Sequence, residues 1–393
     1  MKYSQNKILT THVGSLPRPR DMLMPLHNKE SGLPYDAAAL EIEIDEAVAN
    51  AVKRQVDLGI DIINDGEHGR ASFATYANTR IGGLERLQRP PQHNVKPTRD
   101  AIAFPAVYDE MKKMFGARRV LTGRPVDEVS LVCTGPITYV GQAEVEADIA
   151  HLRKATKGAK AEEVFITAIS PTNLEMYFEN RYYKTEEEYL FALAEAMRVE
   201  YKAVVDAGFI LQVDDPRLIT HYNRMPGITM AENRKFIELR VEVLNHALEG
   251  IPEEKVRFHT CYSINVAPRV HDLEMHHYVD LMLKVKAQGY SIEAANPRHE
   301  HEWRVWNETK LPDHKVLIPG VVSHCVYQVE HPELVADRLE KFAGIVGKER
   351  VIAGTDCGFA TSRAGDELHP DVAWAKLQAL VEGAKIATKR LWH

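Results

Sequence analysis

The sequence is poor in cysteine, in long apolar runs and in clustered basic residues, and each shortage excludes a class of protein. Its 393 residues include only 4 cysteines, too few for a disulfide framework. No apolar run reaches the ~18 residues that a membrane span needs. Acidic and basic residues are interspersed and the formal net charge is -7, so neither nucleic acid nor a membrane is an expected partner.

The N-terminus leads into a predicted strand rather than into the apolar segment of a signal peptide. A cytoplasmic protein with reduced thiols is therefore the expectation. The sequence also lacks a glycine-rich phosphate loop after its first predicted strand, which argues against a doubly wound nucleotide-binding sheet. Length alone would allow two domains, but α/β barrels often exceed that size as one domain.

Short apolar runs alternate with longer segments of helical periodicity, which is typical of repeated βα units. The pattern predicts eight strands, at residues 8–13, 60–64, 164–169, 209–213, 256–261, 291–294, 316–321 and 350–356. Helical periodicity follows most of them, at residues 44–58, 186–207, 232–248, 278–287, 333–346 and 372–391. This count predicts an α/β fold of the (β/α)8 TIM-barrel type. An open, doubly wound sheet is the alternative.

Residues 71–160 interrupt this rhythm, with a helix expected at 106–115 and an extra strand at 129–133. We interpret the segment as an insertion after the second strand, so that residues 1–393 form one barrel domain. The polar residues of interest follow the carboxyl ends of different strands, where barrel enzymes build their active sites.

Three distant stretches could meet at one metal ion. His259 and Cys261 lie two residues apart in a predicted strand, so their side chains point to the same side. Glu293 lies in a short apolar strand, where an unpaired charge is costly, and Cys357 follows the last strand. One nitrogen, one carboxylate and two sulfurs form a tetrahedral set that suits Zn²⁺.

Each of these residues alone also has a purely structural interpretation. A buried cysteine usually behaves as a small hydrophobic residue, and Glu293 could form an ion pair with Arg298 or Arg304. Of the remaining cysteines, we expect Cys133 to pack in the extra strand. Cys325 follows the seventh strand and is expected to be structural, although it could approach the site.

Six short motifs follow one another along the chain. They are Thr10-Thr11-His12-Val13-Gly14-Ser15-Leu16-Pro17-Arg18, Asp65-Gly66-Glu67, Asp214-Asp215-Pro216, His259-x-Cys261, Ile292-Glu293-Ala294 and Asp356-Cys357-Gly358. As a set they resemble the catalytic domain of cobalamin-independent methionine synthase over nearly the whole chain. The resemblance implies a zinc barrel with His259, Cys261, Glu293 and Cys357 as ligands, which matches the set proposed from strand geometry. It also implies that Glu67 and Asp214 hold the amino group of homocysteine and that Ser15 contacts its carboxylate. The structural alternatives are helix capping by Ser15, an ion pair of Glu67 with Arg70, and one of Asp214 with Arg217.

The chain departs from the family pattern on the side expected to receive the alkyl donor. The residues after Glu67, the residues after Glu293 and the segment 358–362 are its own, and the last lacks a basic residue that the family has. Full-length family members also carry a second, N-terminal barrel that this sequence does not include. Single-barrel relatives use other donors, such as a methylated corrinoid, and the epoxyalkane:coenzyme M transferases open an epoxide with a zinc-bound thiol. His68, His299 and His301 could supply the general acid for that opening, and for the last two a surface position without a role is the favoured interpretation.

The leading hypothesis is therefore a zinc-dependent alkyltransferase that takes a small thiol and an alkyl donor, with methyl transfer to homocysteine favoured. Zinc with two thiolates and a carboxylate carries net negative charge, which suits alkylation of sulfur better than hydrolysis. Epoxide opening by a thiol is the second hypothesis. A zinc metallohydrolase or a zinc-binding protein is the third. A homo-oligomer is compatible with the sequence.

Overall fold

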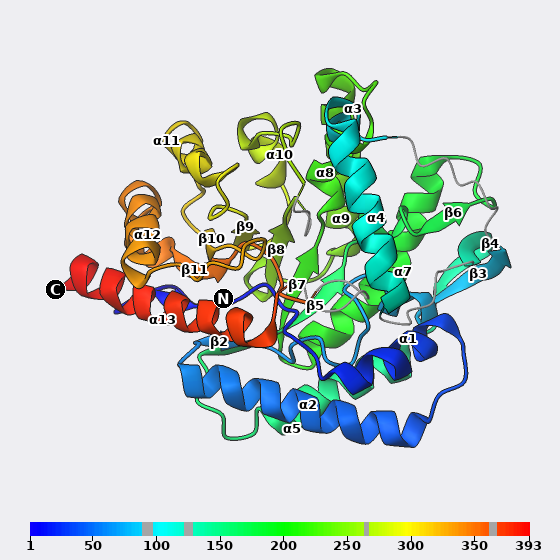
Figure 1. Ribbon diagram of the computed structural model, residues 1–393, viewed down its shortest axis with the longest axis horizontal. Coiled ribbons are helices and arrows are strands. Elements are labelled where there is room, and N and C mark those ends of the chain that lie inside the picture. The colour runs from blue at the N-terminus through cyan, green and yellow to red at the C-terminus, as the bar shows by residue number, and fades with distance from the viewer. Residues whose placement is uncertain (89–96, 122–128, 263–266, 361–367) are drawn as a thin grey trace.

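Eight parallel strands form the centre of the molecule in the order β1-β11-β10-β9-β8-β7-β5-β2. A computed structural model describes residues 1–88, 97–121, 129–262, 267–360 and 368–393 (Figure 1). The barrel strands are β1 Leu9–Thr10, β2 Ile62–Ile63, β5 Glu163–Ile169, β7 Ile210–Asp214, β8 Val256–Thr260, β9 Gly289–Ile292, β10 Val316–Val322 and β11 Ile352–Thr355. All eight overlap the predicted strands, although β9 begins and ends two residues earlier than predicted and leaves Glu293 just after it. The (β/α)8 barrel is confirmed.

The two ends of this strand order meet at β1 and β2. The amide of Asp61 donates to the carbonyl of Thr10 (3.2 Å), and the hydroxyl of Thr11 donates to the carbonyl of Ile62 (3.0 Å). These bonds bring the first and second strands together and nearly close the barrel, so the alternative of an open sheet is wrong.

Helices surround the strands, as Figure 1 shows. They are α1 Leu23–Ser31, α2 Ala37–Leu58, α3 Arg99–Ala103, α4 Pro105–Leu121, α5 Gln142–Ala155, α6 Pro171–Leu174, α7 Glu186–Asp206, α8 Arg217–Arg224, α9 Met230–Ala247, α10 Val279–Met282, α11 Val305–Glu308, α12 Pro332–Val346 and α13 Pro370–Trp392. Short 3-10 helices are η1 Arg20–Met22, η2 Thr75–Thr79, η3 Glu253–Lys255, η4 Met275–His277, η5 Glu300–Arg304 and η6 Lys348–Arg350. None of the described helices combines the length and the apolar character that crossing a membrane requires.

Local sequence signals set the ends of the long helices. Asp36 caps α2 by accepting from the amides of Ala38 and Ala39, and Gly59 ends this helix in a left-handed conformation with φ 86°. Capping boxes begin α7 at Thr185 and α9 at Thr229. The helix predicted at 278–287 is wrong in length, because α10 has only 4 residues and the chain then turns toward β9.

The core has two parts. Seven residues from six barrel strands form a small cluster of their own, namely Leu9, Ile62, Phe165, Ile210, Val316, Ile318 and Ile352. A larger cluster packs the outer faces of the strands against the helices. The barrel is therefore filled by side chains, and its strands are held rigidly on both faces.

The predicted insertion carries a second, smaller sheet. Strand β3 (Ile81–Gln88) pairs antiparallel with β4 (Val129–Tyr139), and β6 (Phe178–Asn180) adds to β4 in parallel. This sheet lies at the right-hand edge of Figure 1, outside the ring of helices. Sequence analysis missed β3 and β6, of which β6 lies beyond the predicted insertion. It also missed α5, which packs against α2.

Candidate active site and metal centre

Two cysteines and one histidine converge at the carboxyl ends of β8 and β11. His259, Cys261 and Cys357 each offer one ligand atom, and these atoms all lie within 4.8 Å of one another. The two Sγ atoms are 3.4 Å apart. The three residues are buried, with exposed fractions of 2%, 3% and 5%. The structure therefore brings together three of the four residues predicted to bind zinc.

The ring of His259 has one nitrogen whose bonding is incomplete. Its Nδ1 lies 3.3 Å from the hydroxyl of Ser291, whereas its Nε2 is buried without a hydrogen-bond partner. Burial, together with the charge of Arg257, lowers the pKa of His259 to about 3, so the ring is neutral and offers a lone pair. Because an unpaired buried nitrogen is costly, its position beside two thiols fits a metal ligand.

The two thiols disfavour ionisation when they have only each other as partners. Contact with Cys261, and then burial, raise the pKa of Cys357 well above its usual range. A divalent cation reverses this preference, because the thiolate is the form that binds a metal. One neutral imidazole and two sulfurs form a donor set that suits zinc.

Glu293 lies close to this cluster, but its carboxylate is already bound by protein donors. Its Oε1 accepts from the amide of Tyr262 (2.8 Å), and its Oε2 accepts from Arg269 (2.8 Å) and Asn296 (2.8 Å). The ion-pair partner is thus Arg269, and not Arg298 or Arg304 as the structural alternative had it. Arg269 also pairs with Asp272 at 2.8 Å, and its backbone is left-handed with φ 58°, so the loop is constrained to present the guanidinium.

Asp356, next to Cys357, joins the loops that carry Glu293 and Cys357. Its Oδ1 accepts from the amides of Ala294 and Ala295, both at 2.8 Å. A Cβ at Gly320 in β10 would lie 2.2 Å from this same Oδ1, so only glycine leaves room for the carboxylate. Sequence analysis missed this arrangement, although Gly320 inside a buried strand was a signal of close approach.

Around the rest of the barrel mouth, Ser15 and Glu67 follow β1 and β2, and Asp214 is the last residue of β7. Glu67 accepts from the hydroxyl of Thr167 (2.9 Å) at Oε1, and its Oε2 lacks a hydrogen bond. Asp214 accepts from Gln212 (2.7 Å). Burial and the charge of Glu67 raise the pKa of Asp214 well above its usual range. Two buried acids that disfavour each other's charge form a site that a cation would complete.

The structural alternatives for these three residues are not observed. Arg70 pairs with Asp148 (3.4 Å) rather than with Glu67, and Arg217 pairs with Glu175 (3.3 Å) rather than with Asp214. Ser15 caps no helix, because its Oγ accepts from the amide of Ala360 (3.3 Å). Asp214 is also in register with His259 on the neighbouring strand, so the acids and the sulfur cluster belong to one site.

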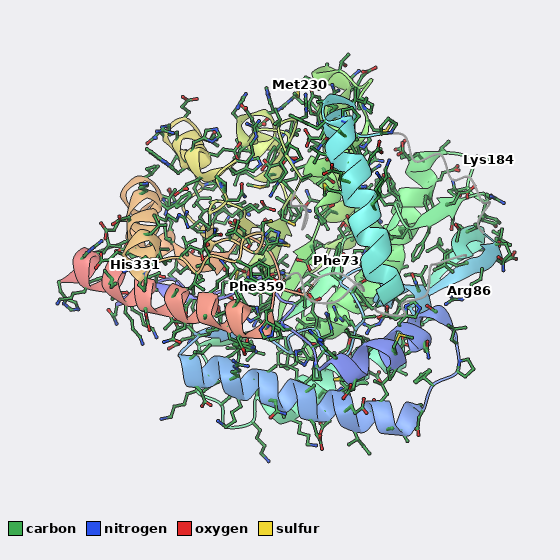
Figure 2. The ribbon with its side chains drawn as sticks, in the orientation of Figure 1. Phe73, Arg86, Lys184, Met230, His331 and Phe359 are labelled. Atoms are coloured by element: carbon green, nitrogen blue, oxygen red, sulfur yellow. The ribbon has the colours of Figure 1, made fainter. Side chains whose placement is uncertain are left out.

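His68 follows Glu67 and is buried, and both of its ring nitrogens lack hydrogen-bond partners in the described structure. Burial, with a further contribution from Arg18, lowers its pKa to about 3, so the ring is neutral. A neutral imidazole is a weak acid, and the role of His68 as a general acid stays a prediction. Figure 2 helps to locate the site. Phe359, two residues after Cys357, lies near the centre of the view, whereas Arg86 and Lys184 lie at its edge.

Three further expectations meet different outcomes. Cys133 is buried in the core, as predicted. Cys325 does approach the site, since its Sγ lies 3.0 Å from His324 Nε2 and 3.9 Å from the Nη1 of Arg269. His299 is not a surface residue, because it stacks on Tyr262 with ring centroids 3.8 Å apart. His301 is exposed, and residues 361 and 362 of the divergent segment lie outside the described residues.

Comparison with known proteins agrees with this geometry. The family model described as the catalytic domain of cobalamin-independent synthase matches residues 8–169 and 178–385. A methionine synthase of Thermococcus kodakarensis is 24% identical over 385 residues, which cover 97% of this chain and 94% of the relative. One of Sulfurisphaera tokodaii is 24% identical, with 97% and 93% covered.

A solved structure shows the same fold. A B12-independent methionine synthase from a Shewanella species superposes with a TM-score of 0.72 at 22% identity, and the match covers 98% of this chain and 99% of that one. The family model spans nearly all of the barrel, including every strand that contributes to the site. This chain therefore belongs to the family of cobalamin-independent synthase catalytic domains.

Proposed function

We propose that the protein transfers a methyl group to the thiol of homocysteine, with zinc held by His259, Cys261, Cys357 and Glu293. The observation that carries this proposal is the convergence of three ligand atoms within 4.8 Å, one of them the unpaired Nε2 of His259. The family and the names of its relatives point to the same reaction. The Shewanella relative was solved in complex with selenomethionine, an analogue of the product.

A zinc ion held at this site would favour the thiolate form of a substrate thiol at neutral pH, which is the nucleophilic form. Glu293 is the weakest of the four proposed ligands, because Tyr262, Arg269 and Asn296 already donate to its oxygens. It is therefore the ligand that an incoming substrate sulfur would replace. Arg269, 2.8 Å from Glu293, would neutralise this carboxylate whenever it is not bound to the metal.

The amino-acid end of the acceptor fits the acid side of the barrel mouth. An ammonium group near Glu67 and Asp214 would relieve the repulsion that raises the pKa of Asp214, and it would supply donors to the unpaired Oε2 of Glu67. The hydroxyl of Ser15 accepts from Ala360 and retains a proton to donate to the carboxylate. The site thus orients the thiol toward the sulfur cluster and holds the other end by charge.

Epoxide opening by a thiol is less well supported. That reaction produces an alkoxide and needs an acid, whereas burial keeps the ring of His68 neutral. Hydrolysis is also disfavoured, because a site with two thiolates is too rich in negative charge to activate water readily.

The purified protein tests the proposal directly. Zinc content should approach one equivalent per chain, and methionine should form from homocysteine with a methyl donor, either a methylated folate or a methylcorrinoid. Coenzyme M with an epoxide serves as the competing assay. Full activity without metal, or alkylation of coenzyme M but not of homocysteine, would refute the proposal.

The organisation around the site is also part of the proposal. We propose that residues 1–393 form one domain, that the insertion at about 71–160 belongs to it, and that the enzyme is cytoplasmic. A homo-oligomer stays a prediction, which light scattering of the purified protein would test.

A further inference from the structure

Arg18 is buried beside Glu67 with part of its guanidinium unused. Its Nε donates to the carbonyl of Glu67 (3.1 Å), and its Nη1 donates to the carbonyl of Ala360. Among the residues that the structure describes, its Nη2 has no hydrogen-bond partner, and Oε2 of Glu67 is 3.7 Å away. The side chain is only 1% exposed, so water does not readily complete it. A buried cation with a free N–H group is a place for an anion.

His68 lies next to this guanidinium. Arg18 bonds to the carbonyl of the residue before it, and both ring nitrogens of His68 are buried without partners. The ring occupies space that a side chain at residue 66 would fill, since a Cβ at Gly66 would lie 2.7 Å from its Cδ2 and 2.8 Å from its Nε2. The glycine therefore makes room for a neutral imidazole that can donate one N–H.

Backbone contacts tie this pair to the metal cluster. The hydroxyl of Thr355 accepts from the amide of Val13 (3.2 Å) and donates to the carbonyl of Cys357 (3.0 Å). The amide of Phe359 donates to the carbonyl of Ser15 (2.9 Å). The loop that holds Arg18 and the loop that holds Cys357 are thus fastened to each other.

The charges of this corner match those of an amino acid. Glu67 is an acid whose Oε2 needs a donor, and Arg18 is a cation whose Nη2 needs an acceptor. At 3.7 Å the two form an ion pair without a hydrogen bond. A zwitterion can complete both groups, with its ammonium on Glu67 and its carboxylate on Arg18. A thiol with a single charged end could complete only one.

We propose that Arg18 and His68 form the subsite for the α-carboxylate of the acceptor, Arg18 as the ion-pair partner and His68 as a neutral donor. This inference rests on the proposed function and deepens it, because it names two further residues that would select an acceptor with an α-carboxylate. Neither residue was assigned this role by its position in the sequence motifs. Ser15, whose hydroxyl lies beside Ala360, would support the same carboxylate.

Calorimetric binding of the product and of two truncated analogues tests the subsite in protein with and without zinc. L-methionine carries both charged groups, methylthiopropylamine lacks the carboxylate, and methylthiobutanoate lacks the amine. Arg18→Gln should lower the affinity for L-methionine and for methylthiobutanoate by about 10- to 100-fold. It should lower the affinity for methylthiopropylamine by less than about threefold. Glu67→Gln should give the converse pattern, and His68→Phe a smaller loss with the pattern of Arg18→Gln.

Arg338→Gln is the matched control. Arg338 is also buried, but its guanidinium nitrogens are all bonded, to Glu300 (2.9 Å) and to the carbonyls of Val321 (2.9 Å) and Ala295 (3.1 Å). This variant should lose stability without changing the relative affinities of the three ligands. Arg18→Lys, which keeps the charge, guards against a variant that fails to fold and should recover part of the loss.

The outcomes separate this inference from the proposed function. If wild type binds L-methionine, and the Arg18 and His68 variants bind each of the three ligands with the affinity of wild type, the subsite assignment is wrong while the proposed function stands. If wild type binds neither L-methionine nor homocysteine, both are wrong.

Discussion

The two sides of the barrel mouth use their polar atoms differently. On the side of β8, β9 and β11, Glu293 receives three donors and Asp356 receives two backbone amides. On the side of β1, β2 and β7, Glu67, Arg18 and His68 are buried with polar atoms that have no hydrogen bond. On the first side the protein supplies most of the partners, and the exceptions among the described residues include Nε2 of His259 and Oδ2 of Asp356.

This difference matches the residence time of what each side is proposed to hold. A structural arrangement of ligands for an ion that stays bound benefits from rigid supporting contacts. A subsite for a substrate that enters and leaves at every turnover needs unsatisfied groups that the substrate itself completes. Unpaired buried atoms are costly, and Glu67, Arg18 and His68 bring four of them to the place where a charged ligand is expected.

The largest effect should come from the sulfur side. Cys261→Ser and Cys357→Ser should each lose zinc and activity, with zinc affinity reduced by more than about 100-fold, because even supporting residues of metal sites cost 10- to 100-fold. The fold should persist, since a barrel of this size has its own core. Mass spectrometry of bound metal, activity and circular dichroism measure the three properties.

Cys133→Ser is the control for that pair, because Cys133 is equally buried but lies in the small sheet. It should keep its zinc. Zinc content like that of wild type in both site variants would refute the ligand assignment.

Arg269→Gln should separate metal-free from metal-loaded protein. Breaking a buried ion pair costs about 3–5 kcal/mol when one charge is left alone, and Glu293 and Arg269 are 0% and 6% exposed. Zinc can neutralise Glu293 in place of arginine, so the loss of unfolding free energy should be smaller when zinc is bound. Urea unfolding of both forms measures this, and an equal loss in both would show that Glu293 does not reach the metal.

On the other side, Glu67→Gln should lower the affinity for homocysteine by about 100-fold, because a hydrogen bond to a charged group contributes about 1.5–3 kcal/mol. The zinc content should be unchanged. Calorimetry with homocysteine and metal analysis of the same sample make the measurement. A coupled loss of zinc would remove the distinction between the two sides.

The smallest expected effect is a change in stability with pH, through the hydrogen bonds of His299 with Asp272 and Glu302. Burial opposes the charged ring of His299, but hydrogen bonds to Asp272 (3.2 Å) and Glu302 (2.9 Å) prevail and raise its pKa to about 9. Since this pKa lies above the unfolded value of about 6.5, the stabilisation is complete below pH 6.5 and disappears as pH rises through 9. Wild type should lose on the order of 2 kcal/mol of unfolding free energy between pH 7 and 10.

His299→Gln should flatten that profile, because the substituted side chain does not titrate. Thermal unfolding monitored across this pH range provides the test, with zinc content followed in parallel. A profile unchanged by the substitution would mean that other groups control the alkaline limit.

The sequence predicted the barrel and the sulfur cluster because both follow from local periodicity. Apolar runs bounded by glycine marked the eight strands, and the spacing of His259 and Cys261 placed both on one side of β8. The roles of Arg269, Arg18 and Asp356 were not predictable, because each depends on a loop that meets another strand's loop in space. The sheet of β3, β4 and β6 was missed for the same reason, since β6 lies far along the chain from β3.

Gly320 affects the geometry of the site although it offers no ligand atom itself. The carboxylate of Asp356 occupies the position that a methyl group there would need, and this carboxylate fastens the turn after Glu293. A single added carbon would thus push the two loops apart and lengthen the reach between Glu293 and Cys357. The absence of a side chain at this position therefore sets the separation of the two loops that carry the proposed metal ligands Glu293 and Cys357.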